Sequence, residues 1–362
     1  MTRIEVALGE RSYPILIGGG LLDTASEHLK PFARDGRLVV VSDENVWNAL
    51  GSRFRAALGG IEAVPIIVAP GEGSKSWLEL EHLTERLIAL GIERSDHIVA
   101  FGGGMIGDLA GFAAAITKRG CSYIQIPTTL LAQVDSSVGG KTAINAGGGK
   151  NMVGAFHQPS LVLIDPETLQ TLPERELRAG HAEIVKYGLI NDPAFFAWCE
   201  ANGAALLSGD RKAQLYAIET SVRAKGDIVA RDERETNGSR ALLNFGHTFA
   251  HALEAEAGLS GALLHGEAVA IGMVLAFRFS AGRGLCSWED AERVAALLRG
   301  AGLPVEIPSS IDPMRLAGHM IRDKKNMAGR LTFILTRGIG RAFVDTSVGI
   351  KEVERFLCAE LS

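Results

Sequence analysis

Short apolar runs and stretches of helical periodicity alternate along the first half of the chain. Runs rich in β-branched residues, each bounded by glycine or polar positions, predict strands at residues 37–42, 64–68, 97–101, 123–126 and 161–164. Residues 79–90 place apolar side chains at helical spacing and stop before Gly91. Nearly continuous apolar strands separated by helices are typical of a parallel sheet covered on both faces. The pattern therefore predicts an α/β fold with a Rossmann-like parallel-sheet domain at the N-terminus.

The second half of the chain has a different pattern, in which helical periodicity dominates. It predicts helices at residues 175–189, 213–231, 248–257, 267–281 and 289–299. A late pair of apolar runs, residues 330–335 and 341–345, predicts a hairpin across Gly338 and Gly340. We therefore predict an N-terminal α/β domain over residues 1–175 and a mostly α-helical C-terminal domain over residues 176–362.

Composition and charge narrow the class of protein. Hydrophobic residues make up 47% of the chain and charged residues 22%, which is typical of a globular protein. The net charge of −5 argues against nucleic acid or a membrane surface as partner. The longest apolar run, residues 268–277, is far shorter than the roughly 20 residues of a membrane span, and the N-terminus lacks the apolar segment of a signal peptide. The four cysteines show no CxxC spacing, so we expect reduced thiols in a cytoplasmic protein.

The glycines gather in two clusters, and the first lies between a predicted strand and a predicted helix. Gly102, Gly104 and Gly107 match the pattern GxGxxG, which allows a backbone to approach a pyrophosphate at a helix N-terminus. Asp108 follows directly, and Asp43 ends an earlier strand, where a carboxylate could reach a ribose hydroxyl. In the usual order the acidic residue follows the glycines by about 20 residues. A tight strand-to-helix turn explains the motif alone equally well.

The second cluster, residues 139–151, contains a Gly-Lys-Thr sequence that suggests a phosphate-binding P-loop. That pattern requires glycine at position 135, which is Asp135, so a Walker-type ATPase or kinase is disfavoured. What remains is a glycine-rich loop with Lys141 and Lys150, suited to holding an oxyanion. The alternative is a flexible surface loop with solvated lysines.

Histidines and a carboxylate in the second half suggest a metal site. His247 and His251 are spaced i and i+4 on a predicted helix, and His265 follows 14 residues after His251. This spacing favours His247 and His251 as a ligand pair, although one core histidine and two exposed ones explain it equally well. Glu183 and Lys186, three residues apart on another predicted helix, form either an exposed ion pair or a pair that faces a cleft.

Six segments, taken together, resemble the 3-dehydroquinate synthases, a family of the sugar-phosphate cyclase group. They read GGGMIGDLAGF at residues 102–112, PTTLLAQVDSSVGGKTAIN at 127–145, GKNMVGAFHQP at 149–159, AEIVKYG at 182–188, LNFGHTFAHALE at 243–254 and HGEAVAIGM at 265–273. The resemblance covers nearly the whole chain. It implies an NAD-binding α/β domain, a helical metal- and substrate-binding domain, and an active site in the cleft between them. It also implies a cytoplasmic homodimer that uses NAD and a divalent metal, zinc or cobalt.

The reaction that the resemblance implies converts 3-deoxy-D-arabino-heptulosonate 7-phosphate to 3-dehydroquinate and phosphate. This is a lyase step of the shikimate route to chorismate and the aromatic amino acids. In the family, hydride passes from C5 to NAD, phosphate leaves by β-elimination and hydride returns. The ring then opens, and an intramolecular aldol reaction closes the carbocycle. The metal polarises the hydroxyl that is oxidised.

The resemblance also assigns site residues in this chain. The family's metal ligands match Glu183, His247 and His265, and His251 becomes a substrate contact, contrary to the spacing argument. The NAD contacts match Asp43, Glu72, Lys75, Gly103, Gly104, Asp108, Thr128, Thr129, Asp135, Ser136, Lys150 and Thr171. The substrate contacts match Asp135, Lys141, Asn151, Lys186, Lys225, Glu235, Arg240, Asn244, His251 and either Lys324 or Lys325. Arg119 matches an arginine that the family supplies from the neighbouring subunit.

Three other functions fit parts of the same pattern. Another sugar-phosphate cyclase, of the valiolone or deoxyinosose type, would share the NAD and metal residues and differ in its substrate contacts. The joint presence of Lys225, Arg240, Asn244 and His251 favours the dehydroquinate reaction. A metal-dependent polyol dehydrogenase would lack GKTAIN and would produce NADH. A non-catalytic NAD-binding regulator would show loss of the cleft residues, and none is evident.

Overall fold

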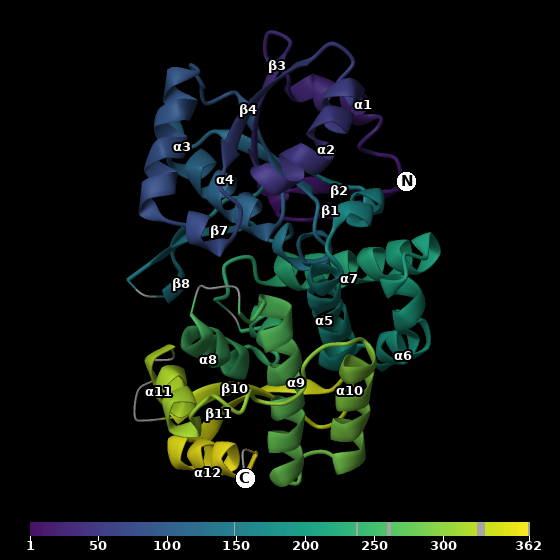
Figure 1. Cartoon of the computed structure of the whole chain (residues 1–362), viewed down its shortest axis with the longest axis vertical. Coiled ribbons are helices and arrows are strands. Elements are labelled where there is room, and N and C mark those ends of the chain that lie inside the picture. Colours follow the sequence, from purple (N-terminus) through teal and green to yellow (C-terminus); the bar gives the residue numbers. More distant parts are fainter. Residues whose placement is uncertain (148, 237, 259–261, 324–329, 361–362) are drawn as a thin grey trace. The chain divides into compact units, whose positions relative to one another are not determined.

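The computed structural model (Figure 1) describes residues 1–147, 149–236, 238–258, 262–323 and 330–360. The chain divides into two compact units. Unit 1 consists of Met1–Pro173 and Gln214–Arg234, and unit 2 of Glu174–Ala213 and Glu235–Ser362. The sequence pattern predicted two continuous domains divided after residue 175, whereas here residues 214–234 belong with the first unit.

Contacts over long sequence separation explain why residues 214–234 belong to unit 1. Most of this segment is helix α7 (Arg211–Arg231). Thr2 Oγ1 donates to Glu219 Oε1 at 2.6 Å. Arg11 donates to both carboxylate oxygens of Glu233, at 3.1 and 2.6 Å. The periodicity of α7 predicts a helix, but it cannot predict these contacts, because the partner residues lie more than 200 positions away in the sequence.

The core of unit 1 is a seven-stranded sheet in the order β1-β2-β9-β6-β5-β3-β4. Its strands are β1 (Thr2–Val6), β2 (Tyr13–Ile17), β3 (Arg37–Asp43), β4 (Glu62–Val68), β5 (His97–Gly102), β6 (Ser122–Pro127) and β9 (Leu161–Ile164). β1 pairs antiparallel with β2, and the other neighbours are parallel. The predicted parallel sheet and its five predicted strands are thus confirmed. The edge pair β1–β2 was not predicted.

Helices cover both faces of this sheet. Val39 and Val41 of β3 pack into a core with α3 (Trp77–Ala89) and α4 (Gly104–Ile116). Leu38 and Val40 pack on the opposite face with α1 (Ala25–Leu29) and α2 (Glu44–Ala57). Successive side chains of a strand point to opposite faces, so a strand buried on both sides needs an unbroken apolar run.

The second glycine cluster forms an antiparallel hairpin rather than the predicted loop. Its strands are β7 (Lys141–Ala146) and β8 (Gly149–Phe156), with an irregular register between Ile144 and Ala146. The hairpin packs against α4. A glycine permits this packing, because a Cβ on Gly111 of α4 would lie 2.5 Å from Thr142 Cγ2 of β7. Another glycine permits the close approach of the two strands, because a Cβ on Gly154 of β8 would lie 2.0 Å from Thr142 O of β7.

Unit 2 is built mostly of helices. They are α5 (Glu174–Asn191), α6 (Pro193–Leu207), α8 (His247–Ala257), α9 (His265–Gly282), α10 (Trp288–Gly300), α11 (Pro313–Asp323) and α12 (Ile350–Glu360). α9 is buried over nearly its whole length and packs against α5, α8 and α10 (Figure 1). A helix that is apolar on all sides belongs in a core.

Unit 2 also contains a β-hairpin. Strands β10 (Arg330–Thr336) and β11 (Ala342–Gly349) form the predicted antiparallel hairpin. Within the described ranges, no helix is both long enough and apolar enough to span a membrane.

Candidate active site

Three side chains suited to metal binding meet at one place in unit 2. Glu183 lies in the middle of α5, and His247 and His265 are the first residues of α8 and α9. Their ligand atoms all lie within 4.8 Å of one another. Glu183 Oε1 is 3.4 Å from Nε2 of His265 and 3.7 Å from Nε2 of His247. One carboxylate and two imidazoles form a donor set that catalytic zinc sites use, with a further position for substrate.

Glycines allow the three helices to approach closely enough for this meeting. A Cβ on Gly266, next to His265, would lie 1.9 Å from the carbonyl oxygen of Ala179, one turn before Glu183. A Cβ on Gly272 of α9 would lie 2.2 Å from the carbonyl oxygen of Gly246, the residue before His247. Gly246 has φ +80°, a conformation that favours glycine. α9 therefore lies backbone to backbone against the segments that carry the other two candidate ligands.

Hydrogen bonds orient both imidazoles toward Glu183. His247 Nδ1 lies 3.2 Å from the carbonyl oxygen of Phe245. His265 Nδ1 lies 3.2 Å from Oε1 of Glu254, a buried carboxylate of α8. Because each acceptor requires a proton on Nδ1, the other ring nitrogen, Nε2, is the one that faces the Glu183 carboxylate and that would coordinate a metal.

The electrostatics of this group favour a cation. Burial, with Lys186 nearby, lowers the pKa of His247 to about 3, so this imidazole is neutral at pH 7. Burial also opposes a charge on His265, but the carboxylates of Glu254 and Glu183 outweigh it and raise its pKa to about 10. Two carboxylates that favour a positive charge on one imidazole would also favour a divalent cation beside it.

Lys186 and Glu183 form a buried pair, which excludes the exposed ion pair considered from the sequence. Lys186 Nζ contacts Glu183 Oε2, and the two side chains are 1% and 0% exposed. Removing one member of such a pair leaves an uncompensated buried charge.

Other predicted contacts of unit 2 lie near this group or on a neighbouring element. The His251 ring is perpendicular to that of His247, with centroids 5.5 Å apart, and His251 is outside the group of three. Arg240 is buried, and its Nε lies 3.5 Å from Glu235 Oε1. Asn244 ends the 3₁₀ helix Arg240–Asn244, which leads into α8.

A second group of predicted residues lies at the carboxyl edge of the sheet in unit 1. The adjacent strands β3, β5 and β6 end at Asp43, Gly102 and Pro127, directly before or at predicted NAD contacts. Asp43 caps α2 by accepting from the backbone N–H groups of Asn45 and Val46. Ligands of open α/β sheets bind at this edge.

The glycine turn and two hydroxyls at this edge fit a nucleotide. The backbone amides at the start of α4 follow Gly103, and a Cβ on Gly104 would lie 2.9 Å from Ser136 Oγ. The hydroxyl oxygens of Thr128 and Ser136 are buried and have no hydrogen-bond partner among the described residues. Buried polar groups are normally satisfied, so these two suit a ligand with polar groups.

Three predicted residues gather around Lys75, which is itself a predicted NAD contact. Its Nζ lies 2.6 Å from Asp108 Oδ2, 3.5 Å from Glu72 Oε1 and in contact with Asn151 Oδ1. Burial disfavours the charged form of Lys75, but Asp108 and Glu72 outweigh it and raise the pKa of the lysine. This buried cation lies beside the first turn of α4.

Asn145 holds the same group together and was missed from the sequence. Its Nδ2 donates to Glu72 Oε1 at 3.0 Å, and its Oδ1 accepts from the backbone N–H of Asn151 at 2.9 Å. Asn151 has φ +54°, a conformation that needs such support. The only sequence signal was a polar residue inside GKTAIN.

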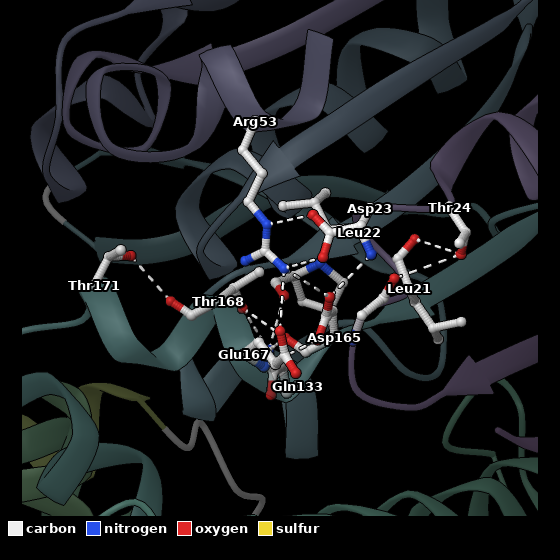
Figure 2. A network of polar contacts seen from close by, with 12 residues as sticks. Leu21, Leu22, Asp23, Thr24, Arg53, Gln133, Asp165, Glu167, Thr168 and Thr171 are labelled. Atoms are coloured by element: carbon white, nitrogen blue, oxygen red, sulfur yellow. Dashed lines mark hydrogen bonds and ion pairs between the residues drawn. The ribbon is translucent and has the colours of Figure 1, made fainter. Parts of the chain in front are cut away.

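Gln133 is a second missed residue, and it anchors the turn that carries Asp135 and Ser136. This π-helical turn (Ala132–Ser136) follows β6. Figure 2 shows Gln133 beside Asp165 and Thr168. Its Nε2 donates to the Pro127 and Asp165 carbonyls at 3.1 Å each and to Thr168 Oγ1 at 3.0 Å. Thr171, a predicted NAD contact, donates to the Thr168 carbonyl at 2.9 Å (Figure 2).

Of the remaining predicted residues, some adjoin these groups, some lie elsewhere and some are outside the described residues. Lys225 of α7 lies 2.9 Å from Asp135 Oδ1. Thr129 Oγ1 accepts from the N–H of Ala132 at 3.2 Å. Arg119 is exposed with φ +67° in the turn after α4, and the hairpin carries the exposed Lys141 and the partly buried Lys150. Lys324 and Lys325 lie outside the described residues.

Sequence comparison identifies the family. Residues 65–179 match the family model described as 3-dehydroquinate synthase N-terminal, and residues 180–326 match 3-dehydroquinate synthase C-terminal. A 3-dehydroquinate synthase of Zymomonas mobilis is 55% identical over 364 aligned positions, covering 99% of this chain and 96% of the relative. One of Caulobacter vibrioides is 53% identical, covering 99% and 98%.

Solved structures agree in fold. A 2-epi-5-epi-valiolone synthase from Streptomyces hygroscopicus with NAD+ and Zn2+ bound has a TM-score of 0.90 and 32% identity, and the match covers 98% of each chain. A 2-deoxy-scyllo-inosose synthase complexed with carbaglucose-6-phosphate, NAD+ and Co2+ has a TM-score of 0.86 and 28% identity, covering 99% of this chain and all of that one. Since both family models match and relatives share more than half of their residues with it end to end, the chain belongs to the 3-dehydroquinate synthase family.

Proposed function

We propose that this chain is an NAD- and metal-dependent lyase that converts 3-deoxy-D-arabino-heptulosonate 7-phosphate to 3-dehydroquinate and phosphate, in the shikimate route to chorismate. The observation that carries the proposal is the meeting of Glu183, His247 and His265, with Lys186 beside them, in a chain whose full-length relatives have this activity by name. Unit 1 is proposed to bind NAD and unit 2 the metal.

The residues present fit both groups. A buried carboxylate and two imidazoles whose Nε2 atoms face it would hold zinc or cobalt, and the edge residues around Gly104, Lys75 and Ser136 would hold NAD. When bound, NAD would supply a reversible hydride acceptor and the metal a Lewis acid for the oxidised hydroxyl. The two structures that carry these groups are cyclases of the same fold.

The chain's own residues have to orient a substrate with two anionic groups. It bears a phosphate and a carboxylate, and loss of phosphate and the later aldol closure both depend on which atoms are held close together. Arg240 offers a planar guanidinium fork that matches a carboxylate, and Lys186 a compact charge beside the metal ligands. His251, one turn after a ligand, would hydrogen-bond the substrate and move a proton there.

Assembly and location follow from the family resemblance. We propose a cytoplasmic homodimer in which Arg119 reaches the active site of the neighbouring subunit. The exposed position of Arg119, in a turn with an unusual backbone conformation, supports this role.

The test is a turnover assay with the heptulosonate phosphate, NAD and zinc. Phosphate and 3-dehydroquinate should form in equal amounts, with no net NADH at the absorbance of the reduced cofactor. Accumulating NADH would instead indicate a polyol dehydrogenase. Faster turnover of sugar phosphates that lack the carboxylate would indicate another cyclase activity.

A further inference from the structure

One side of helix α8 carries three polar side chains, two of which belong to the candidate metal group or contact it. His247, His251 and Glu254 are spaced i, i+4 and i+7, which places them along one side of two helical turns. His247 is one of the three candidate ligands, and Glu254 reaches His265 at the start of α9. α8 thus contacts the candidate metal group twice, once through a ligand and once through a carboxylate behind a ligand.

We propose that Glu254 is a positioning residue for the metal: it fixes the ring orientation and tautomer of His265 so that Nε2 is presented to the ion. This inference rests on the proposed metal function and assigns a role to a residue that the sequence did not single out. The contact is 3.2 Å from His265 Nδ1 to Glu254 Oε1, and the carboxylate is 5% exposed.

His265 needs such a partner because of where it lies. As the first residue of α9, it is not preceded by a helical turn that could restrict its ring. Its backbone is held near the N-cap, since Glu267 accepts from the Leu264 N–H at 2.8 Å and pairs with Arg175 at 2.7 Å. These bonds fix the main chain but leave the imidazole torsions open. The Glu254 carboxylate supplies the missing restraint.

The test compares zinc affinity in the metal-depleted full-length protein and its variants, by competition with a chromogenic chelator. Partners of this kind contribute about 10–100-fold to metal affinity, so Glu254→Ala should weaken zinc binding by that factor. Glu254→Gln should lose less, because an amide oxygen still accepts from Nδ1–H. The absorption bands of bound Co²⁺ should shift in both variants, since they report ligand geometry and not stability.

Glu256→Gln is the matched control. Glu256 lies two residues further along α8 and pairs with His319 at 3.0 Å and Arg315 at 3.1 Å, away from the ligands. The same charge change there should leave zinc affinity unchanged. If Glu254→Ala does not fold, Glu254→Gln carries the test.

Wild-type zinc affinity and unshifted Co²⁺ bands in folded Glu254 variants would overturn the inference and leave the proposed function standing. A wild-type protein that binds no zinc would instead refute the proposed metal site itself.

Discussion

Gly266→Ala tests whether the close contact between α9 and α5 forms the metal site. An ideal Cβ on Gly266 would lie 1.9 Å from the carbonyl oxygen of Ala179, 2.5 Å from its carbonyl carbon and 2.7 Å from its Cα. All three are backbone atoms, so no side-chain rotation relieves the overlap. Since a carbon and a carbonyl oxygen in contact lie about 3.3 Å apart, the two helices must separate by about 1.4 Å.

The expected effect on the metal is larger than the effect on folding. Overpacking of this kind costs about 1–3 kcal/mol, which a chain of this size can tolerate. The strain is applied beside one candidate ligand, His265, and one turn from another, Glu183. Metal–ligand distances tolerate only about 0.2 Å, so a shift of about 1 Å should weaken zinc binding at least tenfold. Misplacement by about 1 Å should also lower turnover about 100-fold.

Chelator competition measures the zinc affinity, phosphate release measures turnover, and thermal denaturation measures folding. Gly282→Ala is the control, because Gly282 ends the same helix and a Cβ there meets nothing within 4 Å. The control should bind zinc normally and gain up to about 1 kcal/mol from the helix preference of alanine. A folded Gly266→Ala protein with wild-type zinc affinity and turnover would refute the reasoning.

Three further substitutions test the candidate roles. Elemental analysis should show that His265→Ala has lost most of its bound zinc, whereas His251→Ala should keep its zinc and lose turnover. If His251→Ala were instead free of zinc and His265→Ala kept it, the ligands would be the i, i+4 pair His247 and His251. Gly104→Val should weaken NAD binding about tenfold or more, equivalent to ~1.4 kcal/mol, because a Cβ there already approaches Ser136 Oγ to 2.9 Å. Titration calorimetry measures the NAD affinity, and an unchanged affinity in the folded variant would contradict the cofactor assignment.

The sheet could be predicted where strands are buried on both faces. Residues 98–101 form an unbroken apolar run because β5 has helices on either side, and the strand predicted at 97–101 was confirmed. Strand β1 was not predicted, because it is an edge strand with the charged residues Arg3 and Glu5 at its exposed positions. An edge strand buries only alternate residues, and five residues are too few to make alternation distinctive.

The hairpin at residues 141–156 could not be predicted from propensity. Glycine and asparagine are depleted in strands, so the sequence favoured a loop. Here the glycines are needed, because a side chain at Gly154 would meet the backbone of the partner strand at 2.0 Å. The requirement at Gly154 comes from the close approach of β7 and β8, and close contacts between different elements leave no periodic signal in the sequence.

The candidate metal group, Glu183, His247 and His265, also could not be predicted from the spacing of residues along the chain. Spacing along one helix favoured His247 with His251, because sequence periodicity detects only neighbours on the same element. The group that forms takes one residue from each of α5, α8 and α9, and depends on contacts at Gly266 and Gly272. The family resemblance supplied this set of residues, but it did not supply the carboxylate behind His265.

A net charge of −5 does not conflict with an anionic substrate, because the relevant cations are buried and paired. Four predicted contact residues each lie beside a carboxylate within their own unit: Lys75 beside Asp108, Lys186 beside Glu183, Lys225 beside Asp135 and Arg240 beside Glu235. A buried cation without a counter-charge would be strongly destabilising, so each cation needs an acid when no ligand is bound. The same acidic residues offset these basic residues in the net charge of the chain. Charge composition therefore excludes a broad basic surface, but it carries no information about local sites that hold phosphate or carboxylate groups.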